Sequence, residues 1–310
     1  MDGVALGAVV FSRTQKLEKL LDSVDGSQIS IVYIADNGKK KNRQHIYEKY
    51  YKFKLIVIDV EYDSGLAYSR RKIVEKMSED CLLLVDCDMT IPANVNVLYE
   101  QLNYNEDIGG ICGMLVEDER VYTTCADIFI DDRACYKDIK ESKEITTIAG
   151  YPFIQFDQIS NAALFRTSCL DDYAWDPEYK IGKEHLDFYL YHKRNTNWKF
   201  GLCPSVHFSH FPGGTAQYEK MRSRTEYSKE YFLNKWDLNH VDTDYSNYID
   251  TYNPKFKGFP PHSDLKKSIV YLREDGIDKF LHKSKNRLQT GSGKLPSLYQ
   301  TIVSKLKKNE

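Results

Sequence analysis

Apolar runs alternate with amphipathic segments along the first part of the chain. The pattern predicts strands over residues 4–11, 29–35, 53–60 and 81–85, and helices over 14–24, 43–51 and 68–77. The first helix has its apolar residues at 17, 20, 21 and 24, which is the spacing of one helical face. This alternation predicts an α/β fold with a mostly parallel central sheet flanked by helices, in which ligands bind at the carboxyl ends of the strands.

The pattern is less regular after residue 89. It predicts helices over 93–102 and 184–194, and strands over 108–116, 121–131, 160–166 and 199–208. Residues 212–261 mix aromatic, charged and turn residues without a period, which indicates a loop-rich region. We therefore expect one domain over residues 1–235, with halves of about 1–90 and 91–235, followed by a loop-rich C-terminal extension over 236–310.

The fourth predicted strand runs directly into two carboxylates, in the sequence LLLVDCD at residues 82–88. Because side chains at i and i+2 point to the same face of an extended chain, Asp86 and Asp88 are predicted to converge on one ion. Carboxylate oxygens suit Mg²⁺ or Mn²⁺, which also bind phosphate oxygens. The alternative is that the two residues only end the strand and cap the turn before Pro92.

Composition narrows the range of partners. The chain has 43 basic and 45 acidic residues and a formal net charge of -2, so no global field attracts nucleic acid. Its seven cysteines form no C-x-x-C pair and are predicted to be reduced core thiols. No apolar stretch reaches the ~18 residues of a membrane span, so a soluble cytoplasmic protein is expected. A basic amphipathic helix over 295–307 leaves peripheral membrane contact open.

Five short motifs follow one another along the chain. VFSRT at residues 10–14 and ADNG at 35–38 close the first two strands, and GLAYSR at 65–70 opens the helix before Asp86. NAALFR at 161–166 and GKEHLD at 182–187 come later. Over roughly residues 4–215 this ordered set resembles the GT-A glycosyltransferases, whose fold is Rossmann-like, and most closely the inverting glycosyltransferase family two.

The resemblance implies contacts with a nucleotide-sugar donor for Ser12, Arg13, Asp36, Asn37, Arg70, Asp86, Cys87 and Asp88. Within this set it implies that Asp36 reads the nucleotide base and that Arg70 lies by the donor phosphates. The D-x-D pair would hold the divalent cation.

A second acidic cluster begins the helix predicted over 184–194. The family has Gly-Glu-Asp-x-Asp-Leu there, and His185 replaces the middle Asp of that motif. Sugar transfer with inversion needs a base to take the proton of the acceptor hydroxyl. Glu184 is the favoured base, with Asp187 positioning the acceptor or His185, and His185 is the rival because an imidazole titrates near neutrality. The alternative is a charge cluster that stabilises the helix dipole.

Two late histidines end the strand predicted over 199–208. A late histidine completes the metal site in many GT-A enzymes, so the resemblance makes His207 the expected third ligand and His210 the second choice. The following FPGGT, residues 211–215, has the flexibility of a hinge and predicts a lid over the donor.

Together these features predict a metal-dependent hexosyltransferase of polysaccharide or glycan biosynthesis. It would use Mn²⁺ or Mg²⁺ to move a sugar from a nucleoside-diphosphate sugar, with a UDP-sugar favoured, to a glycan or other hydroxyl acceptor, and the resemblance implies inversion. One alternative is a sugar nucleotidyltransferase, which should have a Gly-rich loop where this chain has FSRT. The other is a non-catalytic module that binds nucleotide sugars.

Overall fold

The computed structural model describes residues 1, 3–117, 120–138, 143–242 and 248–249. The chain divides into two compact units, residues 1–250 and 251–310, and every described residue belongs to the first. The helix predicted over 295–307 and most of the predicted extension therefore lie outside the described residues. None of the helices described is long and apolar enough to cross a bilayer.

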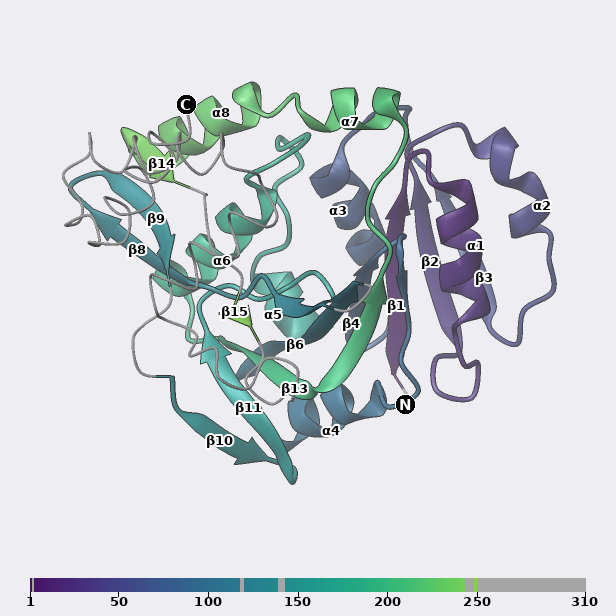
Figure 1. The fold of residues 1–310 in the computed structure, drawn as a ribbon, viewed down its shortest axis with the longest axis horizontal. Helices are drawn as coiled ribbons and strands as arrows, with labels where there is room; N and C mark the ends of the chain where they lie inside the picture. The colour runs from purple at the N-terminus through teal and green to yellow at the C-terminus, as the bar shows by residue number, and fades with distance from the viewer. Residues whose placement is uncertain (2, 118–119, 139–142, 243–247, 250–310) are drawn as a thin grey trace, which may run out of the picture. The chain divides into compact units, whose positions relative to one another are not determined.

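The first four long strands form a parallel sheet in the order β4-β1-β2-β3 (Figure 1). They are β1 (Val4–Val10), β2 (Ile31–Asp36), β3 (Lys54–Asp59) and β4 (Cys81–Asp86). The connecting helices are α1 (Thr14–Asp22), α2 (Gln44–Tyr47), which follows a 3-10 turn at Lys40–Arg43, and α3 (Leu66–Lys76). Every element predicted before residue 86 is present, so the predicted α/β fold class is confirmed.

The sheet is mixed beyond β4. Strand β12 (Ala163–Arg166) lies antiparallel between β4 and β6 (Ile108–Glu117), and β13 (Lys199–His210) lies parallel to β6. Strands β11 (Tyr151–Phe156) and β10 (Ile145–Ile148) continue the sheet in antiparallel order. The parallel order holds where a helix connects successive strands. In the second half β10 and β11 form a hairpin, whereas β12 and β11 reach their other antiparallel partners across longer stretches of chain.

Several short strands complete the unit. Strand β5 (Met89–Thr90) pairs with β13, and β7 (Arg120–Thr123) pairs with β6 and with β15 (Tyr248–Ile249). A separate three-stranded sheet contains β8 (Asp127–Asp131), β9 (Ala134–Asp138) and β14 (His240–Asp242). Because β14 and β15 pair with earlier strands, the folded unit includes residues beyond the expected domain end at 235.

The remaining helices are α4 (Asn96–Tyr104), α5 (Thr167–Asp172), α6 (Glu184–Asn195), α7 (Ala216–Arg222) and α8 (Glu226–Trp236). Helices α7 and α8 follow one another along the top of Figure 1. The prediction of loop over residues 212–261 was therefore wrong for these two segments. Helix α8 is held largely by polar contacts, such as the hydrogen bond that the Tyr231 hydroxyl donates to Asp176. Its sequence therefore lacks the apolar period by which a helix is recognised.

The core confirms the interpretation of the cysteines. All seven are buried and free. The main apolar cluster surrounds β1 and β4 and includes Leu6 and Leu83, which are fully buried. Because β1, β2 and β4 run in the same direction, their carboxyl ends meet at one edge of the sheet, and the predicted site residues follow these ends.

Candidate active site

Asp86 is the last residue of β4, and its carboxylate accepts two hydrogen bonds. Arg70 Nη2 donates to Oδ1 at 3.1 Å, and Asn161 Nδ2 donates to Oδ2 at 3.0 Å. The Asp86 side chain is 30% exposed, whereas the Arg70 side chain is 1% exposed. Arg70 is therefore held inside the protein, while part of the Asp86 carboxylate stays accessible.

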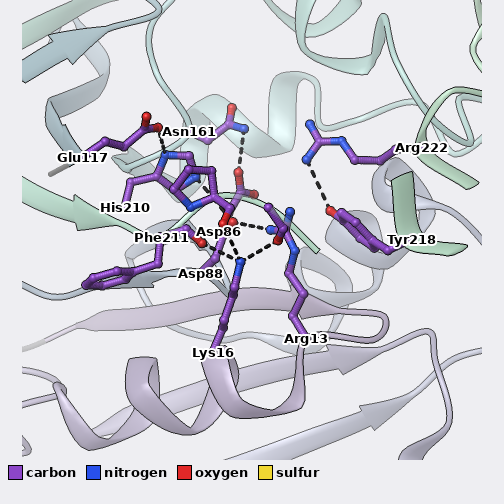
Figure 2. Close-up of polar contacts among 12 residues, drawn as sticks. Arg13, Lys16, Asp86, Asp88, Glu117, Asn161, His210, Phe211, Tyr218 and Arg222 are labelled. Atoms are coloured by element: carbon purple, nitrogen blue, oxygen red, sulfur yellow. Dashed lines mark hydrogen bonds and ion pairs between the residues drawn. The ribbon is translucent and has the colours of Figure 1, made fainter. Parts of the chain in front are cut away.

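Asp88 lies in the same cluster as Asp86 (Figure 2) but is 2% exposed. Its Oδ2 forms an ion pair with Arg13 and lies 3.4 Å from His210 Nε2. Burial raises the pKa of Asp88, but the hydrogen bond with His210 and the charge of Arg13 outweigh burial and hold the pKa below its ordinary value. Asp88 Oδ1 is buried and has no hydrogen-bond partner among the described residues.

The structure places His210, and not His207, next to Asp88. His207 is exposed, and its Nε2 bonds to the Pro204 carbonyl at 2.9 Å. A bulge between Leu202 and His207 shifts the pairing of β13 with β6. This shift exchanges the faces of the alternating side chains, so the structure does not support the expected ligand role of His207.

Strand pairing on both sides fixes the position of His210. On one side it pairs with Met89 of β5, and the neighbouring Phe211 N–H donates to the Asp88 carbonyl at 2.8 Å. On the other side its Nδ1 lies 2.7 Å from Glu117 Oε1, at the end of β6. Burial lowers the pKa of His210, but the hydrogen bonds and charges of Asp88 and Glu117 outweigh burial and raise it.

Basic side chains surround the two carboxylates (Figure 2). The Arg13 guanidinium stacks on the Tyr218 ring at 4.2 Å, and Arg222 Nη1 donates to the Tyr218 hydroxyl at 3.2 Å. Burial lowers the pKa of Arg222, but Tyr218 and the charges of Asp86 and Asp88 raise it by more. Helix α7, which the sequence did not predict, thus contributes a cation to the site.

Lys16 on α1 holds the segment that leads into α7. Its Nζ donates to the carbonyls of Phe211 at 2.6 Å, Pro212 at 2.9 Å and Gly213 at 2.5 Å. Burial and the charge of Arg13 lower the pKa of Lys16. Gly213 has a φ of +88°, which other residues rarely adopt, so the predicted hinge contains a conformation that favours glycine.

Glu184 and His185 begin α6 near Arg70. Glu184 is 5% exposed, and its Oε2 is buried without a hydrogen-bond partner in the described part of the chain. Burial raises the pKa of Glu184, and the charge of Arg70 opposes part of this rise. Arg70 Nη1 lies 2.7 Å from His185 Nε2, and burial and Arg70 together hold the pKa of His185 well below its ordinary value. His185 is therefore neutral with its Nε2 lone pair engaged, which argues against it as the base.

Asp187, by contrast, is part of a structural cluster. It is fully buried and accepts hydrogen bonds from the Tyr179 hydroxyl at 3.0 Å and Trp236 Nε1 at 2.8 Å. It also pairs with Lys235 at 2.9 Å and accepts from the Tyr173 hydroxyl. These contacts join α6 to α8, so the structure does not support the expected role of Asp187 in positioning the acceptor or His185.

Asp36, at the end of β2, is also fully buried and fully paired. Both of its oxygens bond to the Arg43 guanidinium, and the Tyr47 hydroxyl donates to Oδ2 at 2.6 Å. The structure therefore does not support a direct contact between Asp36 and a nucleotide base. Asn37 is the neighbour with an available group, because its Oδ1 is buried and has no partner. At Gly38 a Cβ would lie 1.7 Å from the Phe11 carbonyl oxygen, so the close approach of the two strand ends requires glycine.

The remaining predicted donor contacts differ in exposure. Ser12 is exposed in the turn after β1. Cys87 is buried between the two aspartates, and burial raises the pKa of its thiol to about 12, so it is an inert core residue.

The donor set at the end of β4 fits a divalent cation that takes further ligands from its substrate. No three or more His, Cys, Asp or Glu side chains of the described chain form a group that could hold a metal by themselves. Mg²⁺ and Mn²⁺ commonly bind through one or two carboxylates and complete their shells with phosphate and water. The unpartnered Asp88 Oδ1 and the partly exposed Asp86 carboxylate supply such a set, with His210 beside them.

Three solved structures were compared with this fold. GalNAc-T7 with UDP, GalNAc and Mn²⁺ aligns with 93% of this chain and 57% of its own, at 13% identity and a TM-score of 0.53. S. aureus TarS 1-349 in complex with UDP aligns with 97% of this chain and 78% of its own, at 13% identity and a TM-score of 0.50. A further TarS 1-349 structure aligns with 68% of this chain at 15% identity and a TM-score of 0.45, and this chain spans 60% of its length.

The two structures with TM-scores of 0.53 and 0.50 show the fold, which is GT-A. No curated protein sequence matches the chain. The family model of glycosyl transferase family 2 matches residues 9–172, which is more than half of the chain and includes β4 and both carboxylates that follow it. The match ends before Glu184 and His210, whose placement in the site comes from the structure. The chain belongs to glycosyltransferase family 2.

Proposed function

We propose that this glycosyltransferase uses a divalent cation and transfers a sugar from a nucleoside-diphosphate sugar, with a UDP-sugar favoured, to a hydroxyl of a glycan or other acceptor, with inversion. The observation that carries the proposal is the pair Asp86 and Asp88 at the sheet edge, where one buried carboxylate oxygen has no partner. An unpaired buried oxygen is costly, and a ligand at this point removes the cost. GalNAc-T7 was solved with UDP and Mn²⁺, in agreement with this choice of ligands.

The cations around the carboxylates are suited to a diphosphate. Arg13 lies over the Tyr218 ring, and Arg222 donates to the Tyr218 hydroxyl. The charges of Asp86 and Asp88 act on Arg222 and raise its pKa. A planar guanidinium binds phosphate oxygens through paired N–H donors, and it stays charged at every relevant pH. We assign the diphosphate of the donor to this cluster, where the guanidinium groups stabilise the negative charge that develops on the leaving nucleotide.

Asp86, Asp88 and His210 would hold the divalent cation. When bound, the cation acts as a Lewis acid that neutralises the diphosphate as the glycosidic bond breaks. Arg70 and Asn161 fix the orientation of Asp86 from behind, so this carboxylate is already positioned for its ligand.

Glu184 is the residue that takes the proton of the acceptor hydroxyl. Its Oε2 has no partner, and burial makes the carboxylate more basic than an exposed one. Arg70 donates to both Asp86 and His185 and lies near Glu184, so one buried guanidinium connects the donor side to the base. We base inversion on the resemblance to the inverting family two.

Asn37 is the proposed contact to the nucleotide base. Its Nδ2 donates to the Gly65 carbonyl at 3.4 Å, and its Oδ1 accepts no hydrogen bond from the residues that the structure describes. An amide oxygen in this position accepts a hydrogen bond from the N3–H group of uracil, which is the physical basis for favouring a uridine nucleotide.

Release of nucleoside diphosphate from a panel of nucleotide sugars tests the proposal. The assay is run with Mn²⁺, with Mg²⁺ and with a chelator, on the wild type and on Asp88→Ala. We expect metal-dependent release that falls by about 100-fold or more in Asp88→Ala, because the group that stabilises leaving-group charge is lost.

The matched control is Asp171→Ala, which removes an exposed carboxylate on α5. It should release nucleotide at the wild-type rate, and thermal unfolding should show that all three proteins are folded. Equal release from the wild type and Asp88→Ala, or release unaffected by the chelator, would remove the cation from the proposal.

A further inference from the structure

His210 lies between two carboxylates, Glu117 at the end of β6 and Asp88 in the turn before β5. Strand β13 is flanked by β5 on one side and β6 on the other. The first pairing places His210 Nε2 at 3.4 Å from Asp88 Oδ2, and the second places Nδ1 at 2.7 Å from Glu117 Oε1. Each ring nitrogen therefore has a defined neighbour, and the ring cannot turn over without losing both contacts.

The contact with Glu117 requires a proton on Nδ1. An ionised carboxylate offers only acceptors, so Nδ1–H donates to Glu117 and Nδ1 is not available to a metal. The Tyr122 hydroxyl also donates to Glu117 Oε1 and lies 2.8 Å from His210 Nδ1. With Nδ1–H directed to Glu117, Nε2 is the ring nitrogen that faces Asp88 and the proposed cation site. A cation bound there would take the Nε2 lone pair in place of the Nε2 proton, while Nδ1–H stays on Glu117.

We propose that Glu117, supported by Tyr122, is a positioning residue that fixes the tautomer and orientation of His210 for metal binding. The inference rests on the proposed cation site at Asp86 and Asp88. Histidines that bind metals commonly donate their other ring N–H to a carboxylate, which orients the ring and increases its basicity. Glu117 would then act on the cation through His210.

Metal affinity measures this role without reference to catalysis. Mn²⁺ is titrated into the full-length protein, alone and in the presence of UDP, and the free ion is followed by electron paramagnetic resonance. Removing such a supporting carboxylate typically weakens metal binding by about 10- to 100-fold. We expect that loss in Glu117→Leu and a smaller loss in Glu117→Gln, because the amide oxygen still accepts from Nδ1 but carries no charge.

A double-mutant cycle separates this role from a structural one. If Glu117 acts through His210, adding Glu117→Leu to His210→Ala should weaken Mn²⁺ binding no further. The matched control is Glu100→Gln, which changes an exposed carboxylate on α4 and should bind Mn²⁺ like the wild type. Thermal unfolding of each variant shows that the protein is folded.

The outcomes distinguish this inference from the proposed function. Wild-type protein that binds no Mn²⁺, with or without UDP, would overturn the cation site and this inference with it. Wild-type binding that is unchanged in Glu117→Leu would overturn the role of Glu117 and leave the cation site in place. A Glu117→Leu effect that adds in full to that of His210→Ala would also overturn it, because the residue would then act on the fold.

Discussion

Two carboxylates on α6 lie three residues apart, and both are buried, but their surroundings are opposite. Asp187 faces α8 and is fully paired by two tyrosines, Lys235 and Trp236. Glu184 faces Arg70 and keeps one buried oxygen without a partner. Burial alone therefore does not identify a functional acid. The unmet hydrogen-bonding capacity of the buried group does so.

The same contrast separates the ends of β2 and β4. Asp36 has both oxygens paired with Arg43, whereas Asp88 has one oxygen that is buried and unpartnered. All four carboxylates belong to sequence motifs for which the resemblance implies contact with the donor or a role at the acceptor. In the structure two of them join elements together, and the other two present a free oxygen to the site.

The largest effect is expected from Glu184→Gln, which keeps the shape of the side chain and removes its basicity. Loss of a general base lowers kcat by about 10²- to 10⁴-fold, while the affinity for the donor should stay within about threefold of the wild type. Steady-state kinetics over a range of donor concentrations measure both quantities. A large rise in KM with unchanged kcat would contradict the role of Glu184 as base.

The pH dependence of kcat sharpens this test. The active form of Glu184 is the carboxylate, and burial raises its pKa above the ordinary 4.5. Activity should therefore fall as the pH falls through this raised pKa. The residual activity of Glu184→Gln should lack this acidic limb.

Asp187→Asn should have the opposite effect: it should lower the free energy of unfolding and leave kcat unchanged. The change leaves Lys235 without its buried anionic partner, which typically costs about 3 kcal/mol of unfolding free energy. Urea unfolding measures this loss, and kcat of the folded protein at low temperature should remain close to the wild-type value. Adding Lys235→Met should lower the stability further, because Lys235 also pairs with Asp176 at 2.6 Å and the second change leaves that carboxylate without its cation. A fall in kcat without a loss of stability would erase the contrast between the two carboxylates.

The sequence could predict the half of the fold in which each strand is followed by a helix. Apolar runs identify buried parallel strands, so β1 to β4 and the position of Asp86 and Asp88 at a strand end followed from the pattern. Helix α8 could not be predicted in this way. Its buried face consists of Ser228 and Phe232, and its remaining anchors are hydroxyl, ammonium and indole groups that have no apolar period.

The choice between the two late histidines also lay beyond the sequence. A regular strand would direct His207 and His210 to opposite faces, and which of them faces the site depends on the bulge after Leu202. Likewise, the ADNG motif gives no sign that Arg43 occupies both oxygens of Asp36. Both facts are tertiary, since they arise from partners that only the folded chain brings together.

The smallest expected effect tests whether the contrast extends from carboxylates to cations. All three Lys16 donors contact backbone carbonyls of residues 211–213, whereas Arg222 bonds only to the Tyr218 hydroxyl in the described structure. Arg222→Met should therefore weaken binding of UDP by about tenfold, the loss of one charged hydrogen bond, whereas Lys16→Met should change it by less than about threefold. Isothermal titration calorimetry measures both affinities, with Lys72→Met on the exposed face of α3 as the control.

Lys16→Met should instead increase hydrolysis of the donor in the absence of acceptor, because the segment before α7 loses its anchor and admits water. If Lys16→Met weakened UDP binding as much as Arg222→Met, Lys16 would be a phosphate ligand. A side chain whose donors all bond to the protein could then still bind the substrate, and the contrast would not separate structural groups from functional ones.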